Sequence, residues 1–490
     1  MAKNKSSLFK NLKKHFNEKN LFVFILVFAL IILLMPYLIR IVDYDSVLIG
    51  QMPYYHARIA SSVISKGLPN YDKLSYGGRE YIFNPYHLIL AGFSYVFGVD
   101  FASKLLPFLL GISSLLIFYL IIKNFGFNLD QRALILFIFV MSPLFIYCFS
   151  VSNSYSAAIF LLLMGFYLFV KKKKVFFVFS VISFFLASFF GILNAIITIT
   201  LLLNYLLLNK KKLKRFFIVL FVLLAASSLY YLPFYVKHGL PENFSFISVN
   251  VLQQSVSDMG SLFGFAVFAL ILALIGLIIT WKNKKQLIFV YLTILILVIA
   301  SFYLKYSNMY LNFIFSVFGG IALVKIIKLK WEVEAIKRLT ILVLICGLIF
   351  STVSYLTRIS NLEPNKDIIS SLEWLKDNSE PNDVVFSHYS RGFWIEFFGR
   401  PVVMDSMFNY APDVERRFND SQQIFYDTHL EHTKNLLKKY NISYIWIDKK
   451  MKQGLVWTKK EQGLLFLFRN KETFKNIYNK GNVEIWKVIS

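Results

Sequence analysis

The chain has 490 residues, of which 57% are hydrophobic, 18% aromatic and only 17% charged. Soluble domains carry about a quarter charged residues, so this composition excludes an ordinary soluble protein. The formal net charge of +25 does not indicate nucleic-acid binding, because the lysines cluster in short patches beside apolar runs, where they act as topology signals.

Apolar runs long enough to cross a bilayer recur along residues 1–356, since one helical span needs about 20 residues. The first, about 21–41, follows a lysine-rich N-terminus and no small-residue cleavage site follows it, which predicts a retained helix rather than a signal peptide. The long run 175–208 lies between two lysine-rich patches, which predicts two helices turning near Gly191. The other runs lie near 101–122, 131–149, 154–170, 216–235, 261–281, 286–303, 309–327 and 338–356.

These runs predict about eleven transmembrane helices, with the N-terminus in the cytoplasm. An odd number of spans places three segments outside: a first loop (42–100), a second loop (236–260) and the C-terminal tail. The tail is rich in charge, with strand-like runs at 383–386 and 444–448 and helical stretches near 365–378 and 430–440. The sequence therefore predicts a multi-pass protein of the cell membrane, with an all-α polytopic membrane domain (1–356) followed by a small extracytoplasmic α/β domain (357–490).

Ionisable residues are scarce within the predicted spans. This argues against an ion-coupled transporter, because such proteins usually need carboxylates or histidines along their path. The polar residues gather instead in the outside loops, so we expect any active site at the external membrane face. The first loop is too long for a simple connector, and we expect amphipathic helices within it.

Acidic residues and histidines of these loops are the first candidates for chemistry. Asp43 and Asp45 end the first span, where carboxylates can act as a base or bind a divalent cation; a solvated helix end is an equal alternative. His56 and His87 each follow an aromatic residue, and for them packing on a helix face is favoured over metal binding. Asp258 directly precedes a span, a position that favours a helix N-cap.

Four segments together resemble the catalytic subunit of oligosaccharyltransferase, especially its archaeal forms, within the GT-C class of membrane glycosyltransferases. Met52–His56 fits the family's Asp-x-Tyr-Tyr-His-like segment of the first loop, and Asn84–His87 resembles its Pro-Pro-x-x-His-like run. Ser255–Asp258 resembles the Ser/Thr-x-x-Glu motif with Asp in place of Glu. Ser387–Ile395 fits the frame around the Trp-Trp-Asp-Tyr-Gly signature. The resemblance implies a GT-C-like membrane domain.

The resemblance also assigns roles to particular positions, and at some of these this chain has a different residue from the family. In that family a first-loop acid binds the metal, a late-span arginine binds the donor's phosphate, and the signature block reads the acceptor sequon. Here the first-loop acid's position is Met52, the arginine's is Met309 and the signature Asp's is Ser390. Methionine neither holds a hard cation nor pairs with a diphosphate, so a sequon-dependent peptide reaction is not implied.

Three interpretations remain open. The favoured one is a glycosyltransferase that moves a sugar or glycan from a polyprenyl- or dolichol-phosphate-linked donor to a protein or glycan acceptor, with Asp45 or Asp43 catalytic and Asp45 and Asp258 binding Mn²⁺ or Mg²⁺. The second is a non-catalytic relative that binds lipid-linked glycan. A flippase or exporter is disfavoured because the spans look largely unbroken. The candidate substrate-binding residues are Tyr54, Tyr55, His56, Arg58, Arg79 and Lys305. The cations among them would offset the charge of the leaving phosphate.

Overall fold

The computed structural model describes residues 18–44, 48–75, 77–209, 212–238 and 251–489. They form two compact units. The first, here called the bundle unit, holds the described parts of Met1–Ile39, Lys104–Gly239 and Asn243–Asn361. The second, the loop–tail unit, holds the described parts of Arg40–Ser103 and Leu362–Ser490. The first loop and the tail therefore share one compact unit, and the predicted division at residue 356 stays a prediction.

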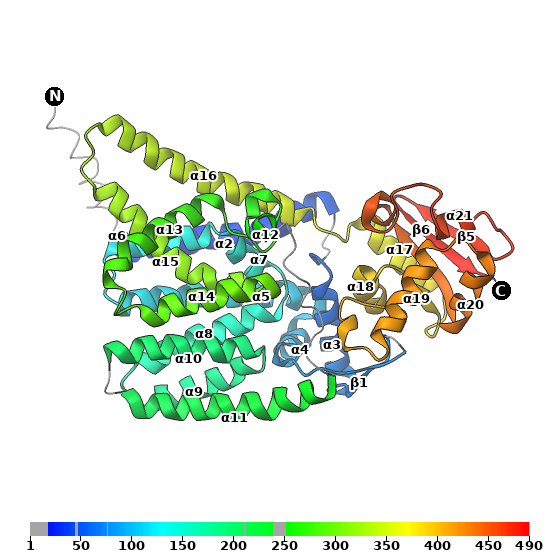
Figure 1. Cartoon of the computed structure of the whole chain (residues 1–490), viewed down its shortest axis with the longest axis horizontal. Helices are drawn as coiled ribbons and strands as arrows, with labels where there is room; N and C mark the ends of the chain where they lie inside the picture. The colour runs from blue at the N-terminus through cyan, green and yellow to red at the C-terminus, as the bar shows by residue number, and fades with distance from the viewer. Residues whose placement is uncertain (1–17, 45–47, 76, 210–211, 239–250, 490) are drawn as a thin grey trace. The chain divides into compact units, whose positions relative to one another are not determined.

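The bundle unit is built of apolar helices (Figure 1). Five helices in the described chain are long and apolar enough to cross a membrane: α2 (Glu18–Tyr44), α5 (Val99–Asn124), α11 (Leu213–His238), α15 (Ser307–Lys328) and α16 (Glu334–Ser360). A sixth span results if α6 (Leu129–Val140) and α7 (Pro143–Ser150), bent by 63°, count as one. The shorter apolar helices are α8 (Ser154–Val170), α9 (Lys174–Ser188), α10 (Ile192–Leu208), α13 (Val267–Thr280) and α14 (Ile288–Tyr303). The chain is a multi-pass membrane protein, and the number of eleven spans stays a prediction.

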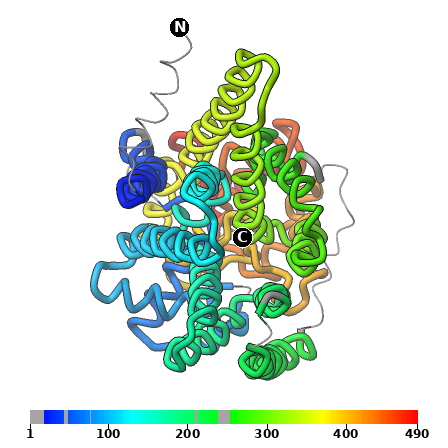
Figure 2. The backbone as a smooth tube through the Cα atoms, turned by 90° about the vertical axis from the view of Figure 1, so that its left-hand side faces the viewer, coloured from blue at the N-terminus to red at the C-terminus, as the bar shows by residue number. Residues whose placement is uncertain are grey.

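The helix break predicted within the run 175–208 is confirmed. α9 ends at Ser188 and α10 begins at Ile192. Between them, Gly191 has a φ of 147°, which side chains other than glycine rarely allow. Helices α8 to α11 lie side by side in both views of the backbone (Figures 1 and 2).

Small residues let helices of the bundle unit approach closely. A Cβ atom added to Gly276 of α13 would lie 2.1 Å from the carbonyl oxygen of Phe318 in α15. A Cβ on Gly320 would lie 2.8 Å from the backbone nitrogen of Ile135 in α6. Glycine at these positions is therefore required by backbone contact, as is common between membrane helices.

The loop–tail unit combines a helical first loop with a four-stranded sheet. The first loop forms α3 (Met52–Lys66), β1 (Tyr71–Asp72), β2 (Arg79–Glu80) and α4 (Pro85–Phe97). The sheet has the order β3–β4–β6–β5, with β3 parallel to β4 and the other pairs antiparallel. Its strands are β3 (Val384–Phe386), β4 (Ile442–Asp448), β5 (Phe474–Lys480) and β6 (Val483–Val488).

Both faces of this sheet are covered, because alternate strand residues point to opposite sides. Ile445 and Ile447 of β4 pack with α19 (Val414–Tyr426), α20 (Leu430–Lys439) and α21 (Leu464–Leu467). Tyr444 and Trp446 pack with α17 (Lys366–Asp377), α18 (Gly392–Phe397) and α3. The strands predicted at 383–386 and 444–448, and the helices near 365–378 and 430–440, are confirmed by β3, β4, α17 and α20.

Candidate functional site

Helix α3 carries most of the predicted substrate-binding residues. Pro53 lies in its first turn, where a missing backbone N–H costs nothing. Gly67 ends it at a φ of 81° and donates its N–H to the carbonyl of Val63 at 3.0 Å. The N-terminal half of the helix is buried on all sides, because the consecutive residues Tyr54, Tyr55, His56 and Ala57 are all buried.

The two tyrosines of α3 are used in packing. The ring of Tyr55 stacks on Phe393 with centroids 4.8 Å apart, and Tyr54 meets Phe397 edge-on at 5.1 Å. Tyr54 is 3% and Tyr55 4% exposed. Both rings therefore fix α3 against α18 of the tail and present little surface to a ligand.

His56 and His87 form a buried pair between α3 and α4. His56 Nδ1 lies 2.8 Å from His87 Nε2, and His87 Nδ1 lies 2.7 Å from the hydroxyl of Tyr81. Asn84 donates its backbone N–H to that hydroxyl at 3.4 Å. The tautomers of the two imidazole rings set the direction of both histidine bonds. The remaining His56 Nε2 is a buried atom with no partner in the described structure.

Both histidines of this pair are neutral. Burial lowers the pKa of His56 to about 3. Burial, with the nearby His56 and Arg58, also holds the pKa of His87 well below its usual range. The pair joins the two helices of the first loop through polar contacts in an otherwise aromatic setting.

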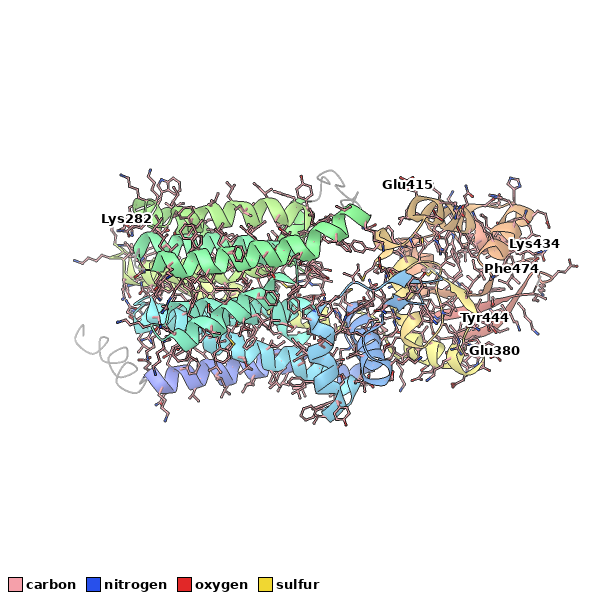
Figure 3. The ribbon with its side chains drawn as sticks, turned by 90° about the horizontal axis from the view of Figure 1, so that it is seen from below. Lys282, Glu380, Glu415, Lys434, Tyr444 and Phe474 are labelled. Atoms are coloured by element: carbon pink, nitrogen blue, oxygen red, sulfur yellow. The ribbon has the colours of Figure 1, made fainter. Side chains whose placement is uncertain are left out.

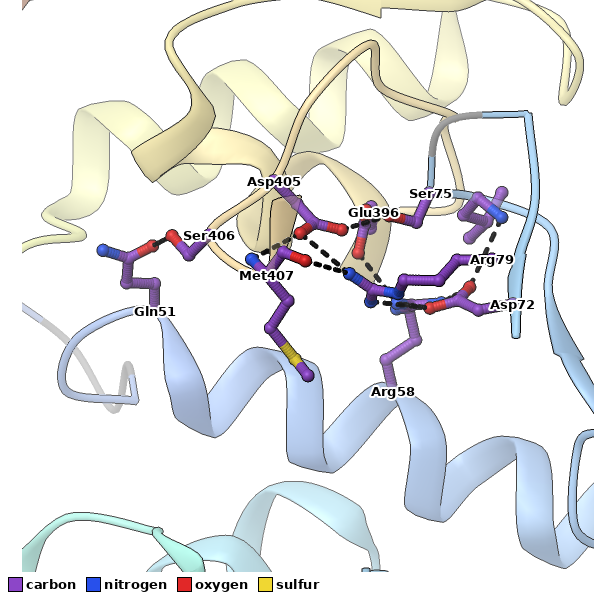
Figure 4. Close-up of polar contacts among 10 residues, drawn as sticks. Gln51, Arg58, Asp72, Ser75, Arg79, Glu396, Asp405, Ser406 and Met407 are labelled. Atoms are coloured by element: carbon purple, nitrogen blue, oxygen red, sulfur yellow. Dashed lines mark hydrogen bonds and ion pairs between the residues drawn. The ribbon is translucent and has the colours of Figure 1, made fainter. Parts of the chain in front are cut away.

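Arg58 is held by two acidic side chains, Asp72 and Glu396 (Figure 4). Its two terminal nitrogens each donate to Asp72 at 2.7 Å, a bidentate pair, and Nη2 also lies 2.7 Å from Glu396 Oε2. Bidentate pairs of this kind are the strong, geometrically specific form of the arginine–carboxylate contact. The guanidinium of Arg58 is therefore already neutralised within the loop–tail unit.

Arg79 lies beside Arg58 and also contacts acidic side chains, Asp72 and Asp405 (Figure 4). Strands β1 and β2 pair Asp72 directly with Arg79, and the arginine's Nη2 lies 3.5 Å from Asp72 Oδ2. Its Nη1 donates to Asp405 Oδ1 at 3.0 Å and to the carbonyl of Met407 at 3.2 Å. Ser75 donates its hydroxyl to the other oxygen of Asp405.

This network sets two arginines against three buried carboxyl groups. Neutrality requires one carboxyl to carry a proton, because an unpaired buried charge is costly. Burial raises the pKa of Glu396 well above its usual range. Burial opposes ionisation of Asp72 as well, but the bonded Arg58 lowers the pKa of Asp72 below its ordinary value. Glu396 is therefore the protonated member. The sequence marked the two arginines but none of the three acids.

Asp258 occupies a tight loop of the bundle unit. Ser257 donates its N–H to Phe265 at 2.8 Å, and Phe265 donates to Ser255 at 2.9 Å. The Asp258 Oδ2 accepts the N–H of Val267 at 2.7 Å, the first residue of α13. The side chain is exposed and satisfies one of the N–H groups left open at a helix start.

Two cations lie on elements that contact this loop. Arg358, near the end of α16, donates to the carbonyl of Ser257 at 2.7 Å and to its hydroxyl at 2.8 Å. Lys305 is exposed in the turn before α15. Asn308, in the first turn of α15, donates its side-chain amide to the Phe263 carbonyl at 2.8 Å and so ties the start of that helix to the loop. Sequence reasoning missed Arg358, which lies in the last turn of α16.

The predicted acids at the end of α2 fall largely outside the description. Asp45 lies outside the described residues, and of Asp43 only the backbone, in α2, is described. Among the residues that are described, no three His, Cys, Asp or Glu side chains come together as metal ligands. Asp258 supplies a single carboxylate with one oxygen engaged, so the described residues do not by themselves fit a divalent cation.

A cavity of about 320 Å³ lies within the bundle unit. Its walls come mainly from α5, α8, α10, α14 and α15, and nearly all lining side chains are apolar, among them Phe118, Leu162, Leu201, Leu297 and Phe313. Such a lining suits a hydrocarbon chain, because it offers few groups that require hydrogen bonds.

No protein-family model matches the chain, and no curated protein matches it. Solved structures do. The archaeal oligosaccharyltransferase AglB from Archaeoglobus fulgidus, in complex with an inhibitory peptide and a dolichol-phosphate, has a TM-score of 0.63 at 15% identity, over 89% of this chain and 70% of that chain. Another structure of the Archaeoglobus fulgidus oligosaccharyltransferase is a complex with zinc and sulfate.

Two other solved structures have a similar fold. The arabinofuranosyltransferase AftD from Mycobacteria has a TM-score of 0.61 at 14% identity, over 96% of this chain and 40% of that chain. ArnT from Cupriavidus metallidurans, bound to undecaprenyl phosphate, has a TM-score of 0.53 at 12% identity, over 95% of this chain and 97% of that chain. At such identities the likeness is one of fold.

Proposed function

Because the chain has the GT-C fold of membrane glycosyltransferases, we propose that it transfers a sugar or glycan from a polyprenyl-phosphate-linked donor to an acceptor at the external membrane face. The observation that carries the proposal is the fold likeness over 89% of the chain to AglB, solved with dolichol-phosphate, and over 95% to ArnT, solved with undecaprenyl phosphate. In this proposal the N-terminus is cytoplasmic and the tail is extracytoplasmic.

The apolar cavity of the bundle unit supports a lipid-linked donor. Its lining of phenylalanine, leucine and isoleucine side chains would hold part of a polyprenyl chain. The phosphate would then lie towards a cationic helix end. Lys305 and Arg358 are the candidates, because Arg58 and Arg79 are already paired with carboxylates. We assign those two arginines to holding the first loop on the tail.

The chemistry needs a base and a stabilised leaving group. A carboxylate of Asp45 or Asp43 would accept the proton of an acceptor hydroxyl or amide as that group attacks the anomeric carbon. The bond from the anomeric carbon to the phosphate oxygen breaks, the configuration inverts, and the lipid phosphate leaves. Positive charge near the phosphate lowers the cost of this step. Asp258 is a second candidate acid.

Radiolabelled-sugar transfer by the purified full-length protein, from a pool of polyprenyl-linked donors, tests the proposal. We expect Asp45→Asn to reduce transfer by about 10²- to 10⁴-fold, the usual contribution of a positioned base. Asp258→Asn tests the second acid. Glu373→Gln, which removes an exposed carboxylate from α17, is the matched control. Adding Mn²⁺ or Mg²⁺, or a chelator, tests the cation.

Two results would contradict the proposal. Transfer that is unaffected by Asp45→Asn, Asp43→Asn and Asp258→Asn would exclude these acids. No transfer from any donor, with lipid-linked sugar still bound, would favour a non-catalytic glycan-binding protein. That outcome has structural support, since Met309 is buried in α15 with 1% exposure where the family resemblance implies the phosphate-binding arginine.

A further inference from the structure

A groove of about 660 Å³ lies on the tail, away from the residues considered above. It is formed by the π-helical turn η6 (Met451–Leu455), the segment 460–469 and the hairpin of β5 and β6. Its size falls within the range of ligand-binding clefts, about 300–1,000 Å³.

The groove has more cations than acids. Its charged lining consists of four cations and one carboxylate: Lys449, Lys452, Lys460, Arg469 and Glu484. Arg469 pairs with Glu461, which lies outside the lining. The Glu484 carboxylate is engaged on both oxygens, by the Lys452 ammonium on one and by the indole N–H of Trp486 on the other, at 3.1 Å. Lys449 and Lys460 are exposed and have no ion-pair partner within the described structure. A cleft lined by one sign of charge concentrates ligands of the opposite sign.

The same groove has an aromatic wall. Trp486 is half-buried and stacks on Phe468 with centroids 4.2 Å apart and planes 2° apart. Phe468 in turn meets Phe474 edge-on at 5.3 Å, so the indole is held rigidly. Amide side chains complete the lining, namely Gln453, Asn479 and Asn482.

We propose that this groove is a binding site for an anionic saccharide, such as a glycan that carries carboxylates. The rigid indole would contact the apolar face of a sugar ring. The amides and Glu484 would bind hydroxyl groups, and Lys449 and Lys460 would pair with the acidic groups of the ligand. This inference goes beyond the proposed transfer reaction, because binding in the groove requires no catalysis.

The shape and lining favour a saccharide over a bilayer surface or a nucleic acid. A flat membrane cannot enter a concave cleft. The aromatic lining is one stacked pair, Trp486 on Phe468, whereas proteins that bind single-stranded nucleic acid stack successive bases on several aromatic side chains. A second groove of the tail, of about 690 Å³, has a different charge balance, since its lining holds the acids Asp377, Glu380 and Asp383 and the lysines Lys438 and Lys487. Glu380 and Tyr444, which both line that second groove, lie close together in Figure 3.

Calorimetric titration of the purified full-length protein with tetragalacturonate tests the site, with a galactose tetramer of the same linkage as the neutral probe. We expect the charged tetramer to bind and the neutral one to bind at least tenfold more weakly. Lys449→Gln with Lys460→Gln should weaken binding about tenfold, the size expected for loss of two exposed ion pairs. Lys471→Gln with Lys475→Gln, also exposed on the tail but outside the groove, is the matched control.

Two further measurements separate recognition of the sugar rings from attraction by charge alone. Trp486→Phe retains an aromatic ring over Phe468 but removes the bond to Glu484, and it should weaken binding without unfolding the tail. A tetraglutamate peptide carries similar charge without sugar rings and should bind less tightly than tetragalacturonate. Equal binding of the peptide, equal loss in both lysine pairs, or no binding of tetragalacturonate would each overturn the proposal. None of these results depends on sugar transfer.

Discussion

At the residue scale, the buried arginines and acids of the loop–tail unit contact one another in a single network. Arg79 contacts two of its acids, Asp72 and Asp405, while 2% of its side chain is exposed. Replacing it with methionine keeps much of the volume but leaves Asp405 without a cation, while Asp72 keeps its pair with Arg58. We expect Arg79→Met to lower the free energy of unfolding by about 3–5 kcal/mol, the usual cost of breaking a buried ion pair. Thermal unfolding of the purified protein measures the effect.

Arg416→Met is the matched control for that measurement. Arg416 pairs with Asp413 at 2.7 Å, but both side chains are 61% exposed, so its loss should change the free energy of unfolding by no more than about 1 kcal/mol. If Arg79→Met and Arg416→Met lower the unfolding temperature equally, the buried network does not stabilise the unit as described.

The protonated Glu396 gives stability a dependence on pH. Its pKa is raised in the folded protein, so its contribution is complete below pH 4.5, the ordinary value, and is lost as pH rises towards the folded pKa. The slope reaches at most about 1.4 kcal/mol per pH unit. Glu396→Gln keeps an acceptor for Arg58 and cannot ionise, so between about pH 5 and 8 we expect it to lose less stability than the wild type.

The unfolding temperature of Glu396→Gln must be compared with that of the wild type at each pH. His56 and His87 are buried and neutral, so their protonation on unfolding makes stability rise with pH over part of the same range. The difference between wild type and Glu396→Gln cancels this common term. A difference in unfolding temperature that stays constant from pH 5 to about pH 8 would contradict a neutral Glu396.

Sequence reasoning found the two arginines of this network but not their roles. Arg58 was predicted to meet a phosphate, yet it is paired with Glu396, which is 338 positions away in the chain. Arg79 is paired with Asp405, 326 positions away. Pairings over such separations leave no local pattern of spacing, so only the folded structure reveals them. Asp258 precedes a predicted span in the sequence, but its carboxylate accepts the N–H of Val267, nine positions on, and the N-cap residue of α13 is Ala266.

At the element scale, close contact between α13 and α15 makes one glycine indispensable. A side chain at Gly276 would meet backbone atoms of Phe318, which cannot move aside as a flexible side chain would. We expect Gly276→Ala to destabilise the purified protein by about 1–3 kcal/mol. Gly92→Ala, in α4 with open space around it, should be neutral or stabilising by up to about 1 kcal/mol. Heating in detergent followed by size-exclusion chromatography compares them; equal behaviour would refute the contact.

Elements with a strong pattern were predictable and those without one were not. The run 175–208 exceeds one span and contains Gly191, so its break was visible in the sequence. Strand β4 is almost entirely buried and reads as an apolar run. Strands β5 and β6 were missed, because β5 exposes charged residues such as Lys475 on one side. Helix α18 has only six residues, too short for a helical repeat to appear.

At the scale of the whole molecule, the fold is preserved where the motif residues are not. No family model matches the chain, yet its fold agrees with AglB over 89% of its length at 15% identity. The apolar runs, the loop lengths and the placement of lysines can all persist while many residues change. At a lipid-facing position, for example, any apolar side chain is suitable. Motif chemistry tolerates few. Sequence reasoning could therefore predict the architecture, while the catalytic residues remain a proposal.

The predicted topology makes a last test of the whole chain. Lysine placement predicts that Lys173 faces the cytoplasm and that the tail, including Lys459, lies outside; both residues are exposed. In a variant with Cys148→Ala and Cys346→Ala, we expect Lys459→Cys to react with a membrane-impermeant maleimide on intact cells. Lys173→Cys should react only after the membrane is opened. Labelling of both cysteines on intact cells, or the reverse order, would contradict an external tail and with it an external site of transfer.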